Sequence, residues 1–249
     1  CEFVIHVGDV IYEDGLLNAY NSVSKVKKNE FLTLKILEQS EEAKVSETIK
    51  SAVKKEFEKY FVKPYSFIPL RFYMTLGNHD HDAAIGPYKI YAASSEQFYL
   101  PHWYYSFEAG TEKNRAAFFS VLSSPLDDKR YQHDFQNGQR SWLMKSLEKS
   151  KANWNIVFAH HAWRSFGVTR HDARAEAPLE EFYQNVLCQN QTQKAHVLLV
   201  GHNHFLEHVK SVSCGGKTAV NHFLSGSGAK LSKVAHCDET HYASQEYGF

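Results

Sequence analysis

Four short motifs carry the side chains in this sequence that could do chemistry, and each follows a run of strand-forming residues. They read Gly8-Asp9-Val10-Ile11-Tyr12, Gly77-Asn78-His79-Asp80, Val157-Phe158-Ala159-His160 and Gly201-His202-Asn203-His204. The ligand candidates among them are one carboxylate, one carboxamide, one phenol and three imidazoles, and we expect all of them to lie outside helices: Asp9, Asn78, Tyr12, His160, His202 and His204. This set of oxygen and nitrogen donors suits one or two metal ions of intermediate hardness, such as iron, zinc or manganese.

The residue types assign different parts in such a centre. Two metal ions a few Å apart need a bridging anion, and Asp9 at a strand end is the candidate. A phenolate from Tyr12 would be a hard, anionic ligand and would favour a trivalent ion such as ferric iron. Asn78 offers a neutral carbonyl oxygen suited to a divalent ion. His202 and His204 project to one side if their chain is extended.

The order and wording of the motifs resemble the dinuclear metallophosphoesterases of the calcineurin-like superfamily. Tyr12, three residues after Asp9, resembles the iron-binding tyrosine of the purple acid phosphatases, and the flanking text resembles their small tartrate-resistant type. The resemblance covers nearly the whole chain except residues 16–50. It implies an α/β fold with a two-sheet β-sandwich flanked by helices, in four α-β-β-α layers, and hydrolysis of phosphate monoesters as an acid phosphatase.

The resemblance also distributes the metal ligands. Asp9, Asn78, His160 and His202 match the site of a divalent ion, which would be Fe²⁺, Zn²⁺ or Mn²⁺. Asp9, Tyr12 and His204 match the Fe³⁺ site, which is one carboxylate short because the family's Asp-x-Gly motif is absent. We therefore expect the chain to be a fragment that lacks the first strand motif and the strands after residue 228.

Histidines outside the ligand set are candidates for substrate contact and proton transfer. His79 matches the family's phosphate-contacting histidine, and His171 lies near the position of a second catalytic histidine. His81 and His161 are adjacent alternatives for binding the substrate. A calcineurin-like phosphodiesterase and a catalytically degenerate binding domain remain alternative interpretations.

Composition limits the partners. The 28 basic and 28 acidic residues balance, so no overall field favours nucleic acid. No apolar run approaches the 18 residues of a membrane span.

Cys188 could pair with Cys214 or Cys237 in an oxidising compartment, or the thiols could be free and buried. The substrate would be a small-molecule or protein phosphomonoester, and the resemblance implies a secreted, periplasmic or lysosome-like location.

Strands that alternate with helices predict a single α/β domain over residues 1–249, with a charged helical insertion at about 16–62. The resemblance implies that this domain is catalytic. We expect a buried strand at 3–7 and further strands at 71–76, 103–107, 116–122, 155–159, 197–200, 205–212 and 223–224. An apolar stripe predicts a helix that Ser40 caps and Lys63-Pro64 ends, with Val45, Ile49, Val53, Phe57 and Phe61 on one face. Further helices are expected at 141–149 and after Pro178, the latter with Leu179, Phe182, Tyr183 and Val186 on its apolar face.

Overall fold

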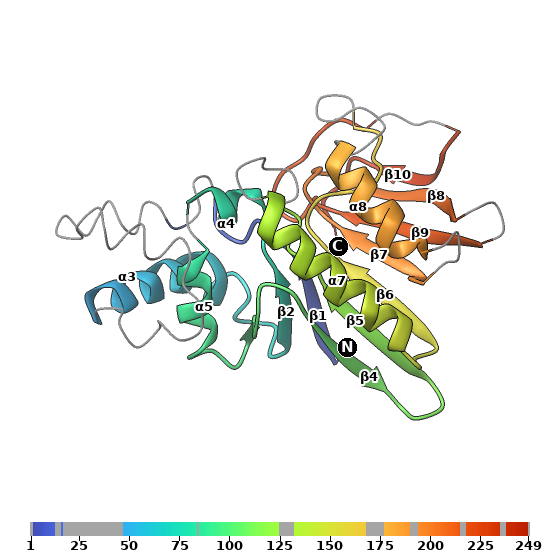
Figure 1. Ribbon diagram of the computed structural model, residues 1–249. Coiled ribbons are helices and arrows are strands. Elements are labelled where there is room, and N and C mark those ends of the chain that lie inside the picture. Colours follow the sequence, from blue (N-terminus) through green and yellow to red (C-terminus); the bar gives the residue numbers. More distant parts are fainter. Residues whose placement is uncertain are drawn as a thin grey trace. The chain divides into compact units, whose positions relative to one another are not determined.

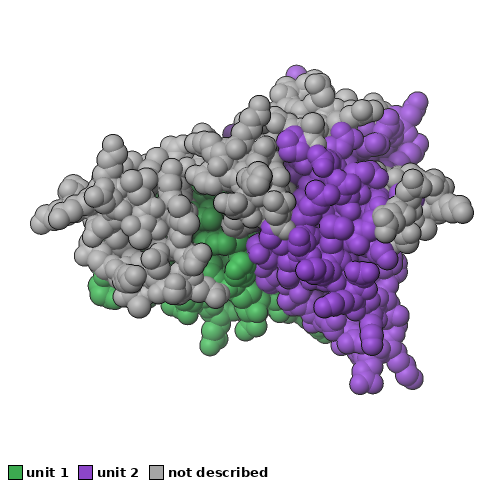
Figure 2. Space-filling view, viewed as in Figure 1, with its two compact units in different colours: residues 1–103 green, residues 104–249 purple. Residues whose placement is uncertain are grey.

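The computed structural model describes residues 2–12, 16, 47–83, 85–124, 132–167, 177–189, 194–214, 218–234 and 238–248. The chain divides into two compact units, residues 1–103 and residues 104–249, which Figure 2 shows in two colours. Each unit has its own sheet, and each is described by itself below.

The first unit contains a three-stranded parallel sheet in the order β1-β2-β3 (Figure 1). Its strands are β1 (Phe3–Val7), β2 (Arg71–Thr75) and β3 (Phe98–Tyr99). Strand β1 was expected to be buried, but all five of its residues are only half-buried. Among the described residues it pairs with β2 alone and has a neighbouring strand on one side only.

Helices of the first unit pack on this sheet through aromatic rings. The helix α3 (Glu47–Phe57) continues into a π-helical turn, η2 (Glu58–Val62), and ends before Pro64 as expected. From the predicted stripe, Val53, Phe57 and Phe61 are buried. Phe57 stacks on Tyr91 of α5 (Gly86–Ala92) with ring centroids 3.9 Å apart. Ser40 and Val45 lie outside the described residues, and so does the side chain of Ile49.

The second unit contains a seven-stranded sheet in the order β10-β8-β9-β7-β6-β5-β4. Its strands are β4 (Tyr105–Gly110), β5 (Arg115–Ser120), β6 (Trp154–Phe158), β7 (Val197–Val200), β8 (Leu206–Cys214), β9 (Thr218–Ser225) and β10 (Thr240–Ser244). Strands β5, β6, β7 and β9 run parallel to one another, and the antiparallel hairpin of β4 and β5 confirms the expected pair. Strand β10 pairs with β8 and was not predicted, since no strand was expected after residue 228.

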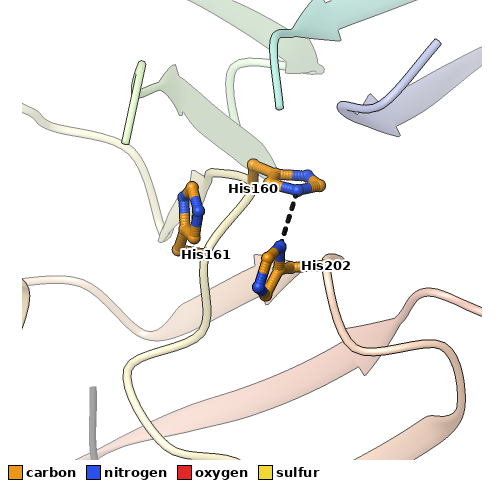
Figure 3. Close-up of side chains that lie close together, drawn as sticks. All are labelled: His160, His161 and His202. Atoms are coloured by element: carbon orange, nitrogen blue, oxygen red, sulfur yellow. Dashed lines mark hydrogen bonds between the residues drawn. The ribbon is translucent and has the colours of Figure 1, made fainter. Parts of the chain in front are cut away.

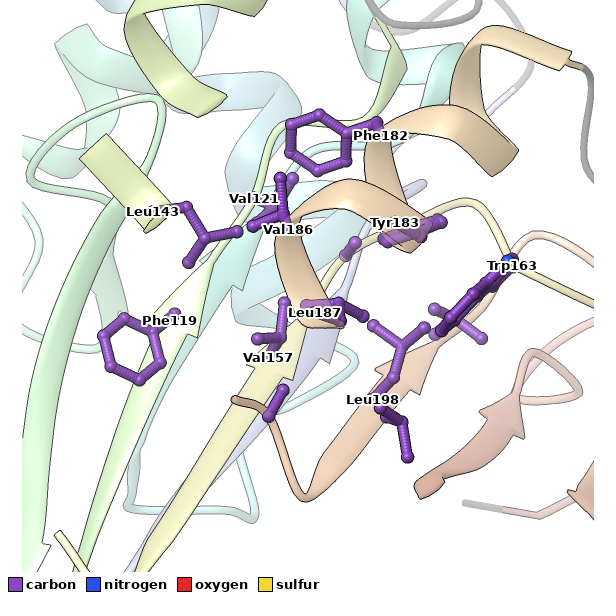
Figure 4. Packing of buried hydrophobic residues seen from close by; sticks show 14 of the residues in the cluster. Phe119, Val121, Leu143, Val157, Trp163, Phe182, Tyr183, Val186, Leu187 and Leu198 are labelled. Carbon is purple, nitrogen blue, oxygen red and sulfur yellow. The ribbon is translucent and has the colours of Figure 1, made fainter. Parts of the chain in front are cut away.

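Two helices, α7 (Gln132–Lys149) and α8 (Ala177–Leu187), bury their apolar residues against this sheet. Figure 4 shows Leu143 of α7 and Phe182 of α8 close to Phe119 and Val157 of the strands. The four residues predicted for the apolar face of α8 are all buried. Helix α7 begins nine residues earlier than expected, at Gln132 rather than Ser141.

A disulfide bond joins Cys188, which follows α8, to Cys214 at the end of β8. This resolves the alternatives left open by the sequence. Both residues belong to the hydrophobic core of the second unit, and their side chains are 4% and 0% exposed.

The two sheets and their flanking helices confirm the expected mixed α/β fold. The single catalytic domain with a helical insertion stays a prediction. Among the described residues, no helix has the length and apolarity needed to cross a membrane.

Candidate metal centre

Parallel pairing explains why the motifs of each unit gather at one sheet edge. In the first unit β1 runs parallel to β2, so Gly8-Asp9 and Gly77-Asn78 both follow carboxyl ends of adjacent strands. In the second unit β6 runs parallel to β7, so His160 and Gly201-His202 do the same. Loops at the carboxyl ends of parallel strands are where α/β proteins place their ligands.

Asp9 is the centre of the polar cluster in the first unit. Its backbone is left-handed, with φ 55°, directly after Gly8, whose φ is 94°. The hydroxyl of Tyr12 donates a hydrogen bond to Asp9 Oδ2 over 2.9 Å, and the backbone N–H of His79 donates to Oδ1 over 3.1 Å. The Tyr12 and His79 rings lie 4.4 Å apart between centroids. The structure therefore brings together a carboxylate, a phenol and an imidazole that the sequence predicted for one centre.

Asp80 fixes the two loops that carry this cluster, a role that the sequence analysis did not assign. Its buried carboxylate accepts hydrogen bonds from the backbone N–H groups of Val10, Ile11 and Gly77. The Tyr88 hydroxyl donates a further bond of 2.6 Å. Burial, and then the charge of Asp9, raise the pKa of Asp80 to about 6. The signal available in the sequence was its position at the end of the second motif.

The second motif was expected to lie outside helices, but Asn78 begins the short helix α4 (Asn78–Ala83). The backbone N–H of His81 donates to the Gly77 carbonyl over 3.0 Å, an i to i−4 bond that closes the first helical turn. The structure thus places Asn78, His79 and His81 in one helical turn directly after the strand segment.

Three imidazoles gather in the second unit (Figure 3). One ring nitrogen from each of His160, His161 and His202 lies within 4.8 Å of the other two. His160 Nε2 is hydrogen-bonded to His202 Nδ1 over 3.1 Å. Two nitrogens at 2.0–2.1 Å from one tetrahedral ion would lie about 3.3 Å apart, so this pair fits a shared metal ion. His202, like Asp9, has a left-handed backbone, with φ 66°.

Backbone hydrogen bonds hold the two histidine loops of this unit side by side. The Gly201 N–H donates to the His160 carbonyl, and the Ala159 N–H donates to the Leu199 carbonyl, each over 3.0 Å. These bonds continue the β6–β7 pairing beyond the strand ends. His204 is buried, and its carbonyl accepts a bond from the Ser232 N–H. His204 is not part of the group of three imidazoles.

A buried network of hydrogen bonds among Asn203, Ser165 and Glu207 holds the fourth motif in place. The side-chain amide of Asn203 donates to Ser165 Oγ over 2.7 Å. Glu207, which is 2% exposed, accepts a bond from the Phe166 N–H over 3.4 Å and interacts with the Ser165 hydroxyl. Burial raises the pKa of Glu207 to about 7. The sequence pattern gave no signal for this network, because Ser165 and Glu207 belong to no motif.

The remaining candidate, His171, lies outside the described residues. The ligands predicted for the divalent and ferric ions therefore form two groups that the structure shows separately. Asp9, Tyr12 and Asn78 belong to the first unit, and His160, His202 and His204 belong to the second. The donor types in both groups suit metal ligation, and so do the distances between Tyr12 and Asp9 and between His160 and His202.

The fold is that of an α/β protein with candidate metal ligands at the carboxyl ends of its parallel strands. The family model for calcineurin-like phosphoesterases matches residues 1–206, which is most of the chain. The protein belongs to the calcineurin-like phosphoesterase family, whose members use dinuclear metal centres.

Solved structures share the fold at low sequence identity. GAP50, the anchor in the inner membrane complex of Plasmodium, is 16% identical with a TM-score of 0.57, over 100% of this chain and 79% of that chain. The purple acid phosphatase PPD1 from yellow lupin seeds is 16% identical with a TM-score of 0.61, and PhoD is 15% identical with a TM-score of 0.59. Each covers 99% of this chain, which spans 41% of PPD1 and 57% of PhoD. No curated protein matches the sequence.

Proposed function

We propose that the protein is an acid phosphatase of the purple acid phosphatase type, which hydrolyses small-molecule or protein phosphomonoesters. One observation carries the choice of this branch: the Tyr12 hydroxyl lies 2.9 Å from Asp9 Oδ2. If Tyr12 loses its proton to a metal ion, a phenolate and a carboxylate oxygen at this separation would suit one hard ion, and ferric iron is such an ion. Membership of the phosphoesterase family supports the reaction class.

The proposal assigns ligands as the resemblance implies. Asp9, Tyr12 and His204 would hold Fe³⁺, while Asn78, His160 and His202 would join Asp9 around Fe²⁺, Zn²⁺ or Mn²⁺. When bound, such ions hold phosphate oxygens and lower the pKa of a water molecule. The protein's own contribution is to fix these side chains, and Asp80 and the Asn203 network support that part of the proposal.

His79 is the proposed group for binding phosphate and protonating the leaving alkoxide. Its backbone is tied to Asp9, and its ring lies against Tyr12, so its position is defined without its being a metal ligand. His171, with His81 and His161 as alternatives, is proposed as a second group on the substrate side. We expect His79→Ala to retain both metals and lose roughly a hundred- to ten-thousandfold in rate.

Leaving-group chemistry tests the role of His79. Aryl phosphates have good leaving groups that need little protonation, so the loss in His79→Ala should be smaller for them than for alkyl phosphates. His81→Ala, two residues further along α4, is compared with it as the test of the alternative assignment. Equal losses for both substrate types would restrict His79 to holding phosphate, and a loss of metal would make its role structural.

Metal identity and substrate class are tested on the holoprotein. A ferric phenolate absorbs visible light, so Tyr12→Phe should remove the colour and preserve the circular dichroism spectrum. Hydrolysis of p-nitrophenyl phosphate should exceed hydrolysis of bis(p-nitrophenyl) phosphate. A colourless, iron-free protein that prefers the diester would be a calcineurin-like phosphodiesterase. A protein that binds no metal would be a binding domain.

We also propose an oxidising compartment: secreted, periplasmic or lysosome-like. The Cys188–Cys214 bond supports it, because protein disulfides persist outside reducing cytosol. The sequence Asn190-Gln191-Thr192 is a glycosylation acceptor if the chain enters a eukaryotic secretory route. Mass spectrometry of the protein from its native source tests both modifications.

A further inference from the structure

Hydrogen bonds from Ser123 and Tyr183 hold both the backbone and the ring of His161. It is 6% exposed, and Ser123 Oγ lies 2.9 Å from its Nδ1 and accepts its backbone N–H over 3.0 Å. The Tyr183 hydroxyl of α8 donates to the His161 carbonyl over 2.7 Å. Two elements distant in the sequence therefore fix both its backbone and the rotation of its ring.

This fixed ring faces the two predicted ligands. The ring centroids of His161 and His202 lie 4.6 Å apart, and those of His161 and His160 lie 4.9 Å apart. Figure 3 shows the three side chains gathered at the ends of their strands. Because Ser123 engages Nδ1, the nitrogen that His161 can turn toward a shared ion is Nε2.

Three imidazoles this close together can share one metal ion; those of His160 and His161 are buried and that of His202 is half-buried. Three histidines are a known set of zinc ligands in proteins. A metal-ligating histidine almost always has its second nitrogen held by a hydrogen-bonding group, and Ser123 occupies that position.

We infer that His161 is a third imidazole ligand of the divalent ion, through Nε2, beside His160 and His202. Ser123 is the positioning residue that sets its ring. The site then takes an imidazole-seeking ion such as Zn²⁺. This assignment replaces substrate contact by His161, and it rests on the proposed function only in taking His160 and His202 as ligands.

Calorimetric titration of the metal-free chain with Zn²⁺ tests the inference. Ser123→Ala should weaken Zn²⁺ binding roughly ten- to a hundredfold, as supporting groups of metal ligands do. His161→Ala should weaken it at least as much, and Ser123→Thr, which keeps the hydroxyl, should restore it. His241→Ala changes an exposed histidine of β10 in the same unit and should bind as the wild type does.

A second measurement separates ligation from a merely structural role. In nitrogen NMR of histidine side chains, Zn²⁺ should shift the Nε2 resonance of His161 in the intact protein. Circular dichroism of each metal-free variant checks that it folds. If His161→Ala does not fold, the NMR result on the intact protein decides whether His161 is a ligand. A His161 resonance that Zn²⁺ leaves unmoved would overturn the inference, as would wild-type affinity in folded His161→Ala.

The outcomes also distinguish this inference from the proposed function. If His160→Ala and His202→Ala lose Zn²⁺ while His161→Ala keeps it, the inference fails and the proposed metal centre stands. If none of the three variants changes binding, both fail. If Zn²⁺ binding depends on all three histidines but no phosphoester is hydrolysed, the inference stands and the proposed function fails.

Discussion

Removing the disulfide should measurably destabilise the second unit. Cys188 and Cys214 are separated by 26 residues, and both sulfurs lie in the core. In the chain-entropy description, closing a loop of this length removes about 3.5 kcal/mol of conformational freedom from the unfolded chain at 25 °C. We therefore expect the free energy of unfolding to fall by about that amount when the bond is absent.

Equilibrium urea unfolding is the assay, followed by tryptophan fluorescence because Trp163 is buried in the same core. The direct comparison is oxidised wild type against wild type kept reduced by dithiothreitol, since both sulfurs remain and only the covalent bond changes. Cys188→Ala with Cys214→Ala should be lower still, because it also loses the packing of the sulfurs. A difference below about 1 kcal/mol between oxidised and reduced wild type would refute the loop-entropy reasoning.

Three further substitutions probe the supports of the candidate centre. Glu207 has a pKa raised to about 7, so the folded state keeps a proton that the unfolded state loses above about pH 4.5. The contribution of Glu207 to the free energy of unfolding therefore falls as the pH rises from 4.5 to 7. The fall is up to about 3 kcal/mol, at about 1.4 kcal/mol per pH unit. Glu207→Gln should remove this contribution to the pH dependence of the free energy of unfolding, measured between pH 5 and pH 8. The same pH dependence in Glu207→Gln and in the wild type would contradict the prediction. Asp80→Asn keeps the shape of the side chain but replaces an acceptor with a donor, so each backbone N–H left unpaired should cost about 1–3 kcal/mol, visible as a lower melting temperature. Gly226→Ala places a Cβ 2.0 Å from the Asn203 carbonyl oxygen and should cost about 1–3 kcal/mol and weaken Zn²⁺ binding, whereas Gly228→Ala meets nothing within 4 Å and should do neither.

Periodicity located most elements because local burial decides them. The apolar face of α8 and the short runs that became β6 and β7 each bury side chains against one core, so their patterns are visible in a single window. Strand β10 was missed because its sequence, Thr-His-Tyr-Ala-Ser, buries only Ala243. An edge strand with one buried residue has too weak a pattern to be recognised.

The residues of the candidate site also fall into those with a local sequence signal and those without one. Motif residues such as Asp9 and His202 could be proposed as ligands because a strand followed by glycine and a donor side chain is a local signal. The supports Ser123 and Glu207 were not found, because their roles come from hydrogen bonds across 38 and 41 positions. Helix α4 was missed because the six residues from Asn78 contain only one apolar residue, Ala83, so its turn depends on backbone bonds and on the loops that Asp80 holds.

The parallel pairing of β1 with β2 has a consequence for synthesis of the chain. Phe3 lies opposite Arg71, so the partner of β1 follows 68 residues later. At translation rates of roughly 5–20 residues per second, β1 waits roughly 3–14 s before β2 is made. During that time Phe3, Val4, Ile5 and Val7 form an apolar stretch whose β2 partner has not yet been made. The hairpin of β4 and β5 needs no such wait, so the first unit is where we expect a nascent chain to need a chaperone.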